Sequence, residues 1–247
     1  VDRPTQKPSS DRLRSVPADY PDPLLESMSM DVVAGQAQPI WITVKVTEDT
    51  PPGTYRAKVG LVGDIDGRPV KATQALSLRV YRATITNTRL WVTEWFGVNA
   101  LHMKINPEKN SDAYYDLMRR FARNMAEHRH NVAIISPMGH ADFGVDANGS
   151  LTVDFSEFDQ WVNVFIEEGV IGLIEGGHIG GRSGGWTSQF VVEVYQAKDG
   201  KAASSTVDPS SADAEAFYKW YFPKLLDHLR ERGWIDRYVQ HLADEPI

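Results

Sequence analysis

Two adjacent carboxylates, Asp244 and Glu245, stand near the end of the sequence in the stretch QHLADEP. Neighbouring side chains of a strand point to opposite faces, so adjacent acids share a site only where a strand ends, and Pro246 marks such an end. Two like charges side by side favour one protonated and one ionised carboxyl group. Cleavage of a glycosidic bond requires a proton donor beside an ionised base. The pair therefore predicts acid–base chemistry on a sugar, with a solvated acidic loop as the alternative.

Aromatic side chains in a second stretch, LWVTEWFG, are suited to hold a sugar ring. Tryptophan presents a large apolar face with a polar edge, which stacks on the apolar face of a pyranose. Trp91 and Trp95 fall on the same side of a strand, and Trp95 lies nearer the strand's end. Trp95 and the neighbouring Glu94 are therefore candidate sugar-binding residues, whereas Trp91 also suits the core.

A glycine-rich stretch, IEGGHIGGRSGGW, supplies the remaining candidates. Glycines let a ligand approach the backbone closely. His178 and Arg182 would donate hydrogen bonds to sugar hydroxyls, and Trp186 would form a second stacking wall. A structural role for His178 is equally compatible with the pattern. No GK[ST] follows and no helix opens directly, so neither a phosphate-binding loop nor a dinucleotide-binding motif is predicted.

The overall composition excludes several classes of function. The chain has 247 residues, with 26 Lys and Arg against 33 Asp and Glu, a net charge of −7. Nucleic acids and anionic membranes require a basic face, so neither is an expected partner. No apolar run approaches the ~20 residues of a membrane-spanning helix. The absence of cysteine excludes thiolate chemistry. We predict neither a metal nor a cofactor.

Residues 1–85 have the alternating pattern of β-structure. Strands are predicted at 39–46, 54–63 and 70–81, separated by the turn sequences EDTPPG and DIDGRP. Short alternating strands at regular spacing predict an N-terminal antiparallel β-sandwich.

Residues 86–247 change to alternating strands and helices. The sequence predicts strands at 88–97, 131–138, 171–181 and 237–246, and helices at 111–130, 154–169 and 212–233. Asp154 is the predicted N-cap of the second helix. A hairpin turn is expected at 146–149 and a short hairpin within 182–211. Consecutive βα repeats without a dinucleotide fingerprint predict the first half of a (β/α)8 TIM barrel, with the acid pair at the C-terminal end of its fourth strand.

Four stretches occur in an order that resembles glycoside hydrolase family 123: QPIWITVKVTEDTPPGTYRAKV, EWFG, IEGGHIGGR and GWIDRYVQHLADEP. The resemblance extends from about residue 20 to the end. It implies a bacterial β-N-acetylgalactosaminidase with a β-sandwich followed by a (β/α)8 catalytic barrel, here ending after the fourth strand. The implied partner is a glycan with a terminal or internal β-linked N-acetylgalactosamine.

The family's mechanism is retaining and uses the substrate's own 2-acetamido group as the nucleophile. By resemblance, Asp244 orients the acetamide and stabilises its developing positive charge. Glu245 is then the general acid for the leaving oxygen and later the base that activates water. A nucleophile supplied by the substrate removes the need for carboxylates on opposite sides of the anomeric carbon, which suits two adjacent acids.

Other interpretations remain open at this point. The chain could be a glycosidase for another β-linked sugar, or a glycan-binding module without catalysis. A half-barrel leaves two exposed sheet edges, so completion by a second copy, as a homo-oligomer, or by further sequence is expected. The polar start without Met, VDRPTQKPSSDR, suggests a mature or shortened boundary from which a signal peptide is missing. Together with glycan chemistry, it suggests a secreted, periplasmic or cell-surface bacterial location.

Overall fold

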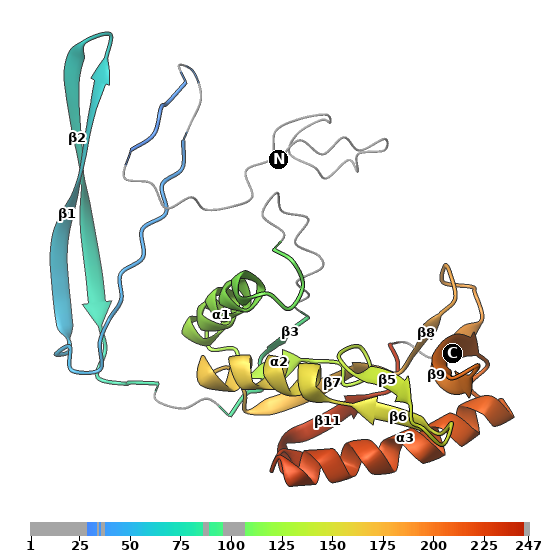
Figure 1. The fold of residues 1–247 in the computed structure, drawn as a ribbon. Helices are drawn as coiled ribbons and strands as arrows, with labels where there is room; N and C mark the ends of the chain where they lie inside the picture. Colours follow the sequence, from blue (N-terminus) through green and yellow to red (C-terminus); the bar gives the residue numbers. More distant parts are fainter. Residues whose placement is uncertain (1–28, 34, 36–37, 86–88, 96–106, 245–247) are drawn as a thin grey trace. The chain divides into compact units, whose positions relative to one another are not determined.

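The computed structural model describes residues 29–33, 35, 38–85, 89–95 and 107–244 (Figure 1). Contacts between residues divide the chain into two compact units, residues 1–86 and 87–247.

In the first unit, strands β1 (Gly53–Ile65) and β2 (Arg68–Val80) form a long antiparallel hairpin. Asp66 and Gly67 connect them with φ values of 52° and 79°. Two successive residues with positive φ are typical of the tight hairpin turn whose twist matches the strands. The backbone N–H of Gly67 donates to the Asp64 carboxylate at 2.6 Å. The strands predicted at 54–63 and 70–81 are therefore confirmed.

Residues 39–46 form no strand, so that prediction was wrong. Their alternating apolar side chains are all exposed: Ile40 50%, Ile42 52%, Val44 49% and Val46 45%. Alternation favours a strand only where a neighbouring strand pairs with its backbone. Here β1 and β2 pair with each other. The described part of this unit thus contains one two-stranded sheet and does not show a sandwich.

The second unit is built on a parallel sheet. Its strands are β3 (Thr93–Glu94), β4 (Val132–Ile134), β7 (Leu173–His178) and β11 (Tyr238–His241), in the order β11-β7-β4-β3. Helices α1 (Asp112–Glu127), α2 (Ser156–Glu167) and α3 (Ala212–Glu231) connect successive strands. The predicted alternation of strands and helices is confirmed, with strands shorter than expected. Among the described residues the sheet is open, with β3 and β11 at its edges.

Local sequence signals explain where the helices begin and end. The hydroxyls of Ser111 and Ser211 accept from the backbone N–H groups of Tyr114 and Ala214, each at 3.2 Å, and cap α1 and α3. Gly233 follows α3 with a φ of 69°, which suits the end of a helix. Pro223 lies inside α3.

The predicted N-cap of α2 was displaced by one residue. Phe155, not Asp154, occupies the cap position, and it makes no side-chain capping bond. The Asp154 carboxylate instead accepts from the backbone N–H of Ser156 at 2.7 Å. Asp154 still satisfies a free amide of the first turn, but from the end of the preceding strand.

The core lies between the helices and one face of the sheet. Side chains that are at most 2% exposed include Ile174 of β7, Phe158 and Phe165 of α2, and Leu225 and Leu229 of α3. Because strand side chains alternate, the residues flanking Ile174 turn to the opposite face. That second face carries the polar side chains described below.

Two antiparallel sheets are inserted after β4 and β7 (Figure 1). Strands β5 (Asp142–Val145) and β6 (Leu151–Asp154) form a hairpin whose turn contains Gly149, at a φ of 81°. Strands β8 (Gly180–Arg182), β9 (Phe190–Lys198) and β10 (Lys201–Val207) form the other. The predictions of a hairpin turn at 146–149 and a hairpin within 182–211 are confirmed.

Candidate active site

Three aromatic rings meet at the C-terminal ends of three parallel strands. Trp95 follows β3, His178 ends β7 and His241 ends β11. The centroids of His178 and His241 are 4.1 Å apart, and Trp95 lies 5.1 Å from His178 and 5.8 Å from His241. The ring pairs are edge-to-face, the favourable arrangement for aromatic groups. Parallel strand ends thus bring together residues that are distant in the sequence.

A carboxylate lies on the same sheet as these rings. The hydroxyl of Thr93 donates to Oε2 of Glu175 at 2.9 Å, and Nδ1 of His241 lies 3.2 Å from its Oε1. Because Ile174 points to the helices, Glu175 occupies the opposite face of β7. The polar contacts therefore cross this face from β3 to β11.

The consecutive glycines before His178 have a specific structural cause. A methyl group on Gly176 would lie 2.1 Å from the hydroxyl oxygen of Tyr238, and Gly177 has a φ of 70°. Gln240 Nε2 donates to the carbonyl oxygen of Gly177 at 2.7 Å. Burial raises the pKa of the Tyr238 hydroxyl, which stays protonated and donates to the Gln240 side chain. Tyr238 and Gln240 thus fix the irregular end of β7 that carries His178, where the register with β11 shifts.

Asp244 is three residues beyond the end of β11. The carbonyl of Leu242 accepts from the backbone N–H groups of Ile179 at 3.1 Å and Gly180 at 3.0 Å. These bonds fasten the segment that leads to Asp244 against the segment that follows β7. Asp244 therefore lies on the C-terminal side of the sheet. Glu245 lies outside the described residues.

The other sequence-predicted residues occupy different surroundings. Oε2 of Glu94 lies 3.5 Å from Nδ1 of His130, which precedes β4, so its side chain turns away from Thr93 and Glu175. The guanidinium of Arg182 lies 5.6 Å from the ring centroid of Trp186, near the start of the β8–β9 connection. Trp186 is 68% exposed and available for stacking. The structure therefore brings Trp95 and His178 together, and separately Arg182 and Trp186.

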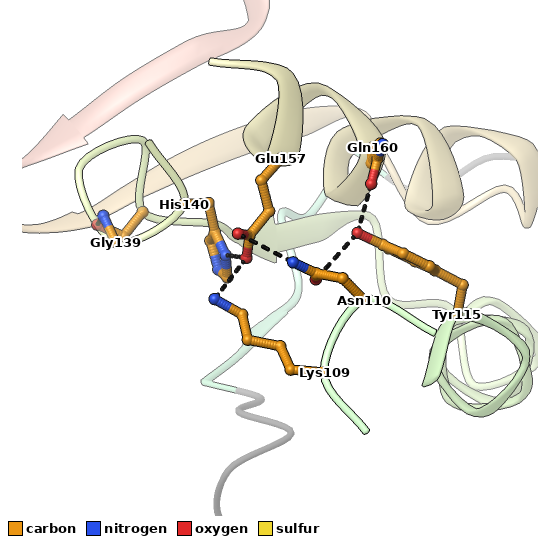
Figure 2. A network of polar contacts seen from close by, with 8 residues as sticks. Lys109, Asn110, Tyr115, Gly139, His140, Glu157 and Gln160 are labelled. Atoms are coloured by element: carbon orange, nitrogen blue, oxygen red, sulfur yellow. Dashed lines mark hydrogen bonds and ion pairs between the residues drawn. The ribbon is translucent and has the colours of Figure 1, made fainter. Parts of the chain in front are cut away.

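A polar network ties together the connections on the same side of the sheet (Figure 2). Oε1 of Glu157, in the first turn of α2, lies 3.0 Å from both Lys109 Nζ and His140 Nδ1. Asn110 Nδ2 approaches Oε2 at 3.4 Å. Lys109 and Asn110 precede α1, and His140 follows β4. Glu157 therefore links the segment before α1 and the segment after β4 to the first turn of α2, near the C-terminal ends of the strands.

The charge state of this network follows from burial and pairing. Burial raises the pKa of Glu157, but the hydrogen bonds from His140 and Lys109 outweigh it, so the pKa is lowered overall. Burial lowers the pKa of His140, and its bond to Glu157 offsets this only in part. At neutral pH the network thus pairs an ionised Glu157 with a neutral His140.

Three contributors to the site were missed by the sequence reasoning: Thr93, Glu175 and His241. Glu175 had a readable signal, since it is the one charged residue in the apolar strand sequence IGLIEGG. Its partner His241 could have been sought on the neighbouring strand, three residues before Asp244. The hydroxyl of Thr93 gave no signal, because threonine is common in strands for its shape alone.

A surface hollow in the described part of the chain lies away from these strand ends. It has a volume of about 570 Å³ and lies between the start of α2 and the end of α3. Its lining includes Asp159, His228 and Arg232. Within the described ranges, no group of three or more His, Asp or Glu has metal-binding geometry. None of the helices in those ranges is long and apolar enough to cross a membrane.

Two family models match the sequence of this chain. The sequence matches the family model "Glycoside hydrolase 123, catalytic domain" over residues 95–247. It matches "Glycoside hydrolase 123 N-terminal domain" over residues 4–63. A search among curated proteins returned no match.

The fold is similar to that of a family 123 glycoside hydrolase from Clostridium perfringens, studied for glycolipid glycan hydrolysis. The TM-score is 0.61 at 15% sequence identity, and the similarity covers 81% of this chain and 37% of that protein. At this identity the likeness supports the fold alone, and the chain spans little more than a third of that protein's length. Because the catalytic-domain model matches more than half of its residues, the chain belongs to glycoside hydrolase family 123.

Proposed function

We propose that the chain acts in a retaining β-N-acetylgalactosaminidase that uses the 2-acetamido group of its substrate as the nucleophile. The observation that carries the proposal is the strand-end cluster. Trp95, His178 and His241 gather at the C-terminal ends of the parallel strands, and Asp244 follows β11 on that side. Glu245 is the next residue in the sequence. Enzymes built on parallel βα units place their chemistry at these ends.

The proposed reaction has two steps. First, the acetamide carbonyl oxygen attacks the anomeric carbon while the glycosidic bond breaks, and Glu245 gives its proton to the leaving oxygen. Asp244 orients the acetamide N–H and stabilises the positive charge of the oxazolinium-type intermediate. Second, water attacks the anomeric carbon as Glu245 takes its proton. The acetamide is restored, one water is consumed and the β-configuration is retained.

Sugar binding is assigned to the side chains around this pair. Trp95 is 55% exposed and offers a stacking face beside His178. Arg182 and Trp186 provide a charged donor and a second aromatic face on the β8–β9 connection. Glu94 remains a candidate only if its contact with His130 opens when substrate binds. The proposed partner is a glycan with a terminal or internal β-linked N-acetylgalactosamine.

The proposed architecture is a β-sandwich followed by a (β/α)8 barrel. The described β1–β2 hairpin would belong to the sandwich, and the parallel sheet with α1, α2 and α3 to the barrel. A second copy of the chain could cover the open edges of the sheet. Equilibrium sedimentation tests this: a dimer supports it, and a strictly monomeric, stably folded protein contradicts it. A secreted, periplasmic or cell-surface bacterial location is proposed on the basis of glycan chemistry.

The direct test of the catalytic assignment is hydrolysis of an aryl 2-acetamido-2-deoxy-β-galactoside by the wild-type protein and two isosteric variants. Glu245→Gln removes the proton donor and is expected to lower kcat by at least ~10²-fold. Asp244→Asn is expected to lower kcat by a similar factor, because it removes the charge that stabilises the intermediate. Asp227→Asn, at an exposed ion pair on α3, is the matched control and should leave kcat unchanged.

Two outcomes of this assay would contradict the proposed activity. Faster cleavage of the gluco-configured aryl substrate would indicate another hexosaminidase. Sugar binding without turnover, unchanged by Glu245→Gln, would indicate a glycan-binding module. Assaying the chain beside one continued past residue 247 separates a wrong assignment from a missing part of the barrel.

A further inference from the structure

Glu175 is held from two sides. Thr93 Oγ1 donates to Oε2 at 2.9 Å, and Nδ1 of His241 approaches Oε1 at 3.2 Å. The Glu175 side chain is only 14% exposed. Each oxygen therefore has a partner, one from β3 and one from β11. Because both oxygens face protein side chains, Glu175 acts on a ligand through these partners.

The contact with Glu175 determines where His241 carries its proton. An ionised carboxylate only accepts hydrogen bonds, so Nδ1 of His241 must be the protonated nitrogen. In the neutral imidazole, Nε2 is then an acceptor. Free neutral histidine favours the opposite tautomer, with the proton on Nε2. The Glu175 carboxylate thus selects the form of the ring that is otherwise disfavoured.

His241 lies among the aromatic rings of the candidate site and is accessible to solvent. The His241 side chain remains 29% exposed, so a ligand can reach it. Its ring packs edge-to-face against His178 and approaches Trp95, the proposed stacking residue. We propose that Glu175 is a positioning residue that fixes His241 as the Nδ1–H tautomer. His241 then offers Nε2 as a hydrogen-bond acceptor to a hydroxyl of the sugar. This inference rests on the proposed glycosidase function.

The tautomer is measurable without any substrate. In ¹⁵N-labelled protein at pH 8, long-range ¹H–¹⁵N spectra of the histidine rings should show His241 protonated at Nδ1, with its signals assigned by their loss in His241→Gln. Glu175→Leu should shift His241 to the Nε2–H form. Thr93→Val is the matched control: it removes the other partner of Glu175 and should leave the tautomer unchanged. An Nε2–H tautomer in the wild-type protein overturns the proposal, and this result needs no variant to fold.

The acceptor role is tested by titrating the same sample with N-acetylgalactosamine. Hydrogen bonding from the sugar should move the Nε2 resonance of His241 while Nδ1 stays protonated. Saturable sugar binding without movement of that resonance overturns the acceptor role. Absence of aryl-glycoside hydrolysis with the expected tautomer would instead count against the proposed function, so the two failures are distinguishable.

Measuring kcat and KM of a Glu175 variant distinguishes a positioning role of Glu175 from direct participation in catalysis. Glu175→Gln should raise KM by ~10-fold with kcat changed only a few-fold, as expected for loss of one hydrogen bond made equally in the ground and transition states. A fall in kcat as large as that of Glu245→Gln would show that Glu175 is itself a proton donor or base, and would overturn the positioning role.

Discussion

Two glycines, Gly176 and Gly177, precede His178 at the end of β7, and each has its own structural cause. Gly176 leaves room for the Tyr238 hydroxyl, and Gly177 adopts a left-handed conformation that other residues rarely tolerate. The result is a shift in register between β7 and β11, beyond which His178 pairs with His241. This irregularity positions both rings of the candidate site, and it can be tested apart from catalysis.

Gly176→Ala should destabilise the protein by about 1–3 kcal/mol, because its methyl group would displace the half-buried Tyr238 side chain. Urea denaturation followed by fluorescence measures the change. Gly181→Ala is the matched control, since a methyl group there meets no atom within 4 Å, and it should be nearly neutral. Equal stability of the two variants would contradict the packing described for Gly176.

The network around Glu157 predicts a loss of stability in acid. The pKa of His140 is lowered in the folded protein from its ordinary value of 6.5. As the pH falls below 6.5, the unfolded chain therefore binds a proton at His140 before the folded protein does, and the folded protein loses stability. The pKa of Glu157 is also lowered, so its contribution is complete above its ordinary value of 4.5 and is lost as the pH falls further. Both groups therefore stabilise the fold near pH 7.

Comparing denaturation midpoints at pH 7 and pH 5.5 tests the His140 part of this prediction. The wild-type protein should be less stable at pH 5.5. His140→Asn keeps a hydrogen-bond donor but cannot titrate, so its midpoint should fall less over the same interval. An equal fall in both proteins would show that His140 does not contribute in this range.

At the level of elements, one buried carboxylate joins two helices. Asp159 of α2 is 4% exposed, its Oδ1 lies 2.7 Å from Nε2 of His228 on α3, and its other oxygen contacts Arg232 just after α3. Buried charges are tolerated only when they are paired. The first turns of α2 are thereby fixed to the last turn of α3, which leads into β11.

Asp159→Ala should lower the free energy of unfolding by about 3 kcal/mol. This is the low end of the range for breaking a buried ion pair, because the Arg232 side chain is 48% exposed to water. Asp227→Ala removes an exposed partner of Arg230 and should change stability by less than about 1 kcal/mol. Chemical denaturation of both variants measures the difference. A small effect of Asp159→Ala would show that solvation of Arg232 and His228 replaces the lost contacts.

Periodicity was enough to predict the elements of the second unit but not all of the first. Helices α1 and α3 follow from serine caps and regularly spaced apolar residues, so their order and approximate bounds could be predicted. Residues 39–46 show the same alternation as β1 and β2 yet form no strand, because alternation does not reveal which backbone will pair. Strand partners are a tertiary property.

At the scale of the whole molecule, the site depends on contacts between distant parts of the sequence. The carboxylate–imidazole contact joins residues 66 positions apart, and no local pattern connects them. Trp95 and His178 could be proposed because aromatic and glycine-rich motifs stand out in a sequence. Their proximity follows only from the order of the parallel strands.

The measurement that tests the central claim most directly compares two aryl β-galactosides that differ only in the 2-acetamido group. If the acetamide is the nucleophile and Asp244 and Glu245 assist it, only the acetamido substrate is hydrolysed, and the first product retains the β-configuration. Efficient hydrolysis of the plain β-galactoside would contradict the claim, because no substrate nucleophile would then be needed.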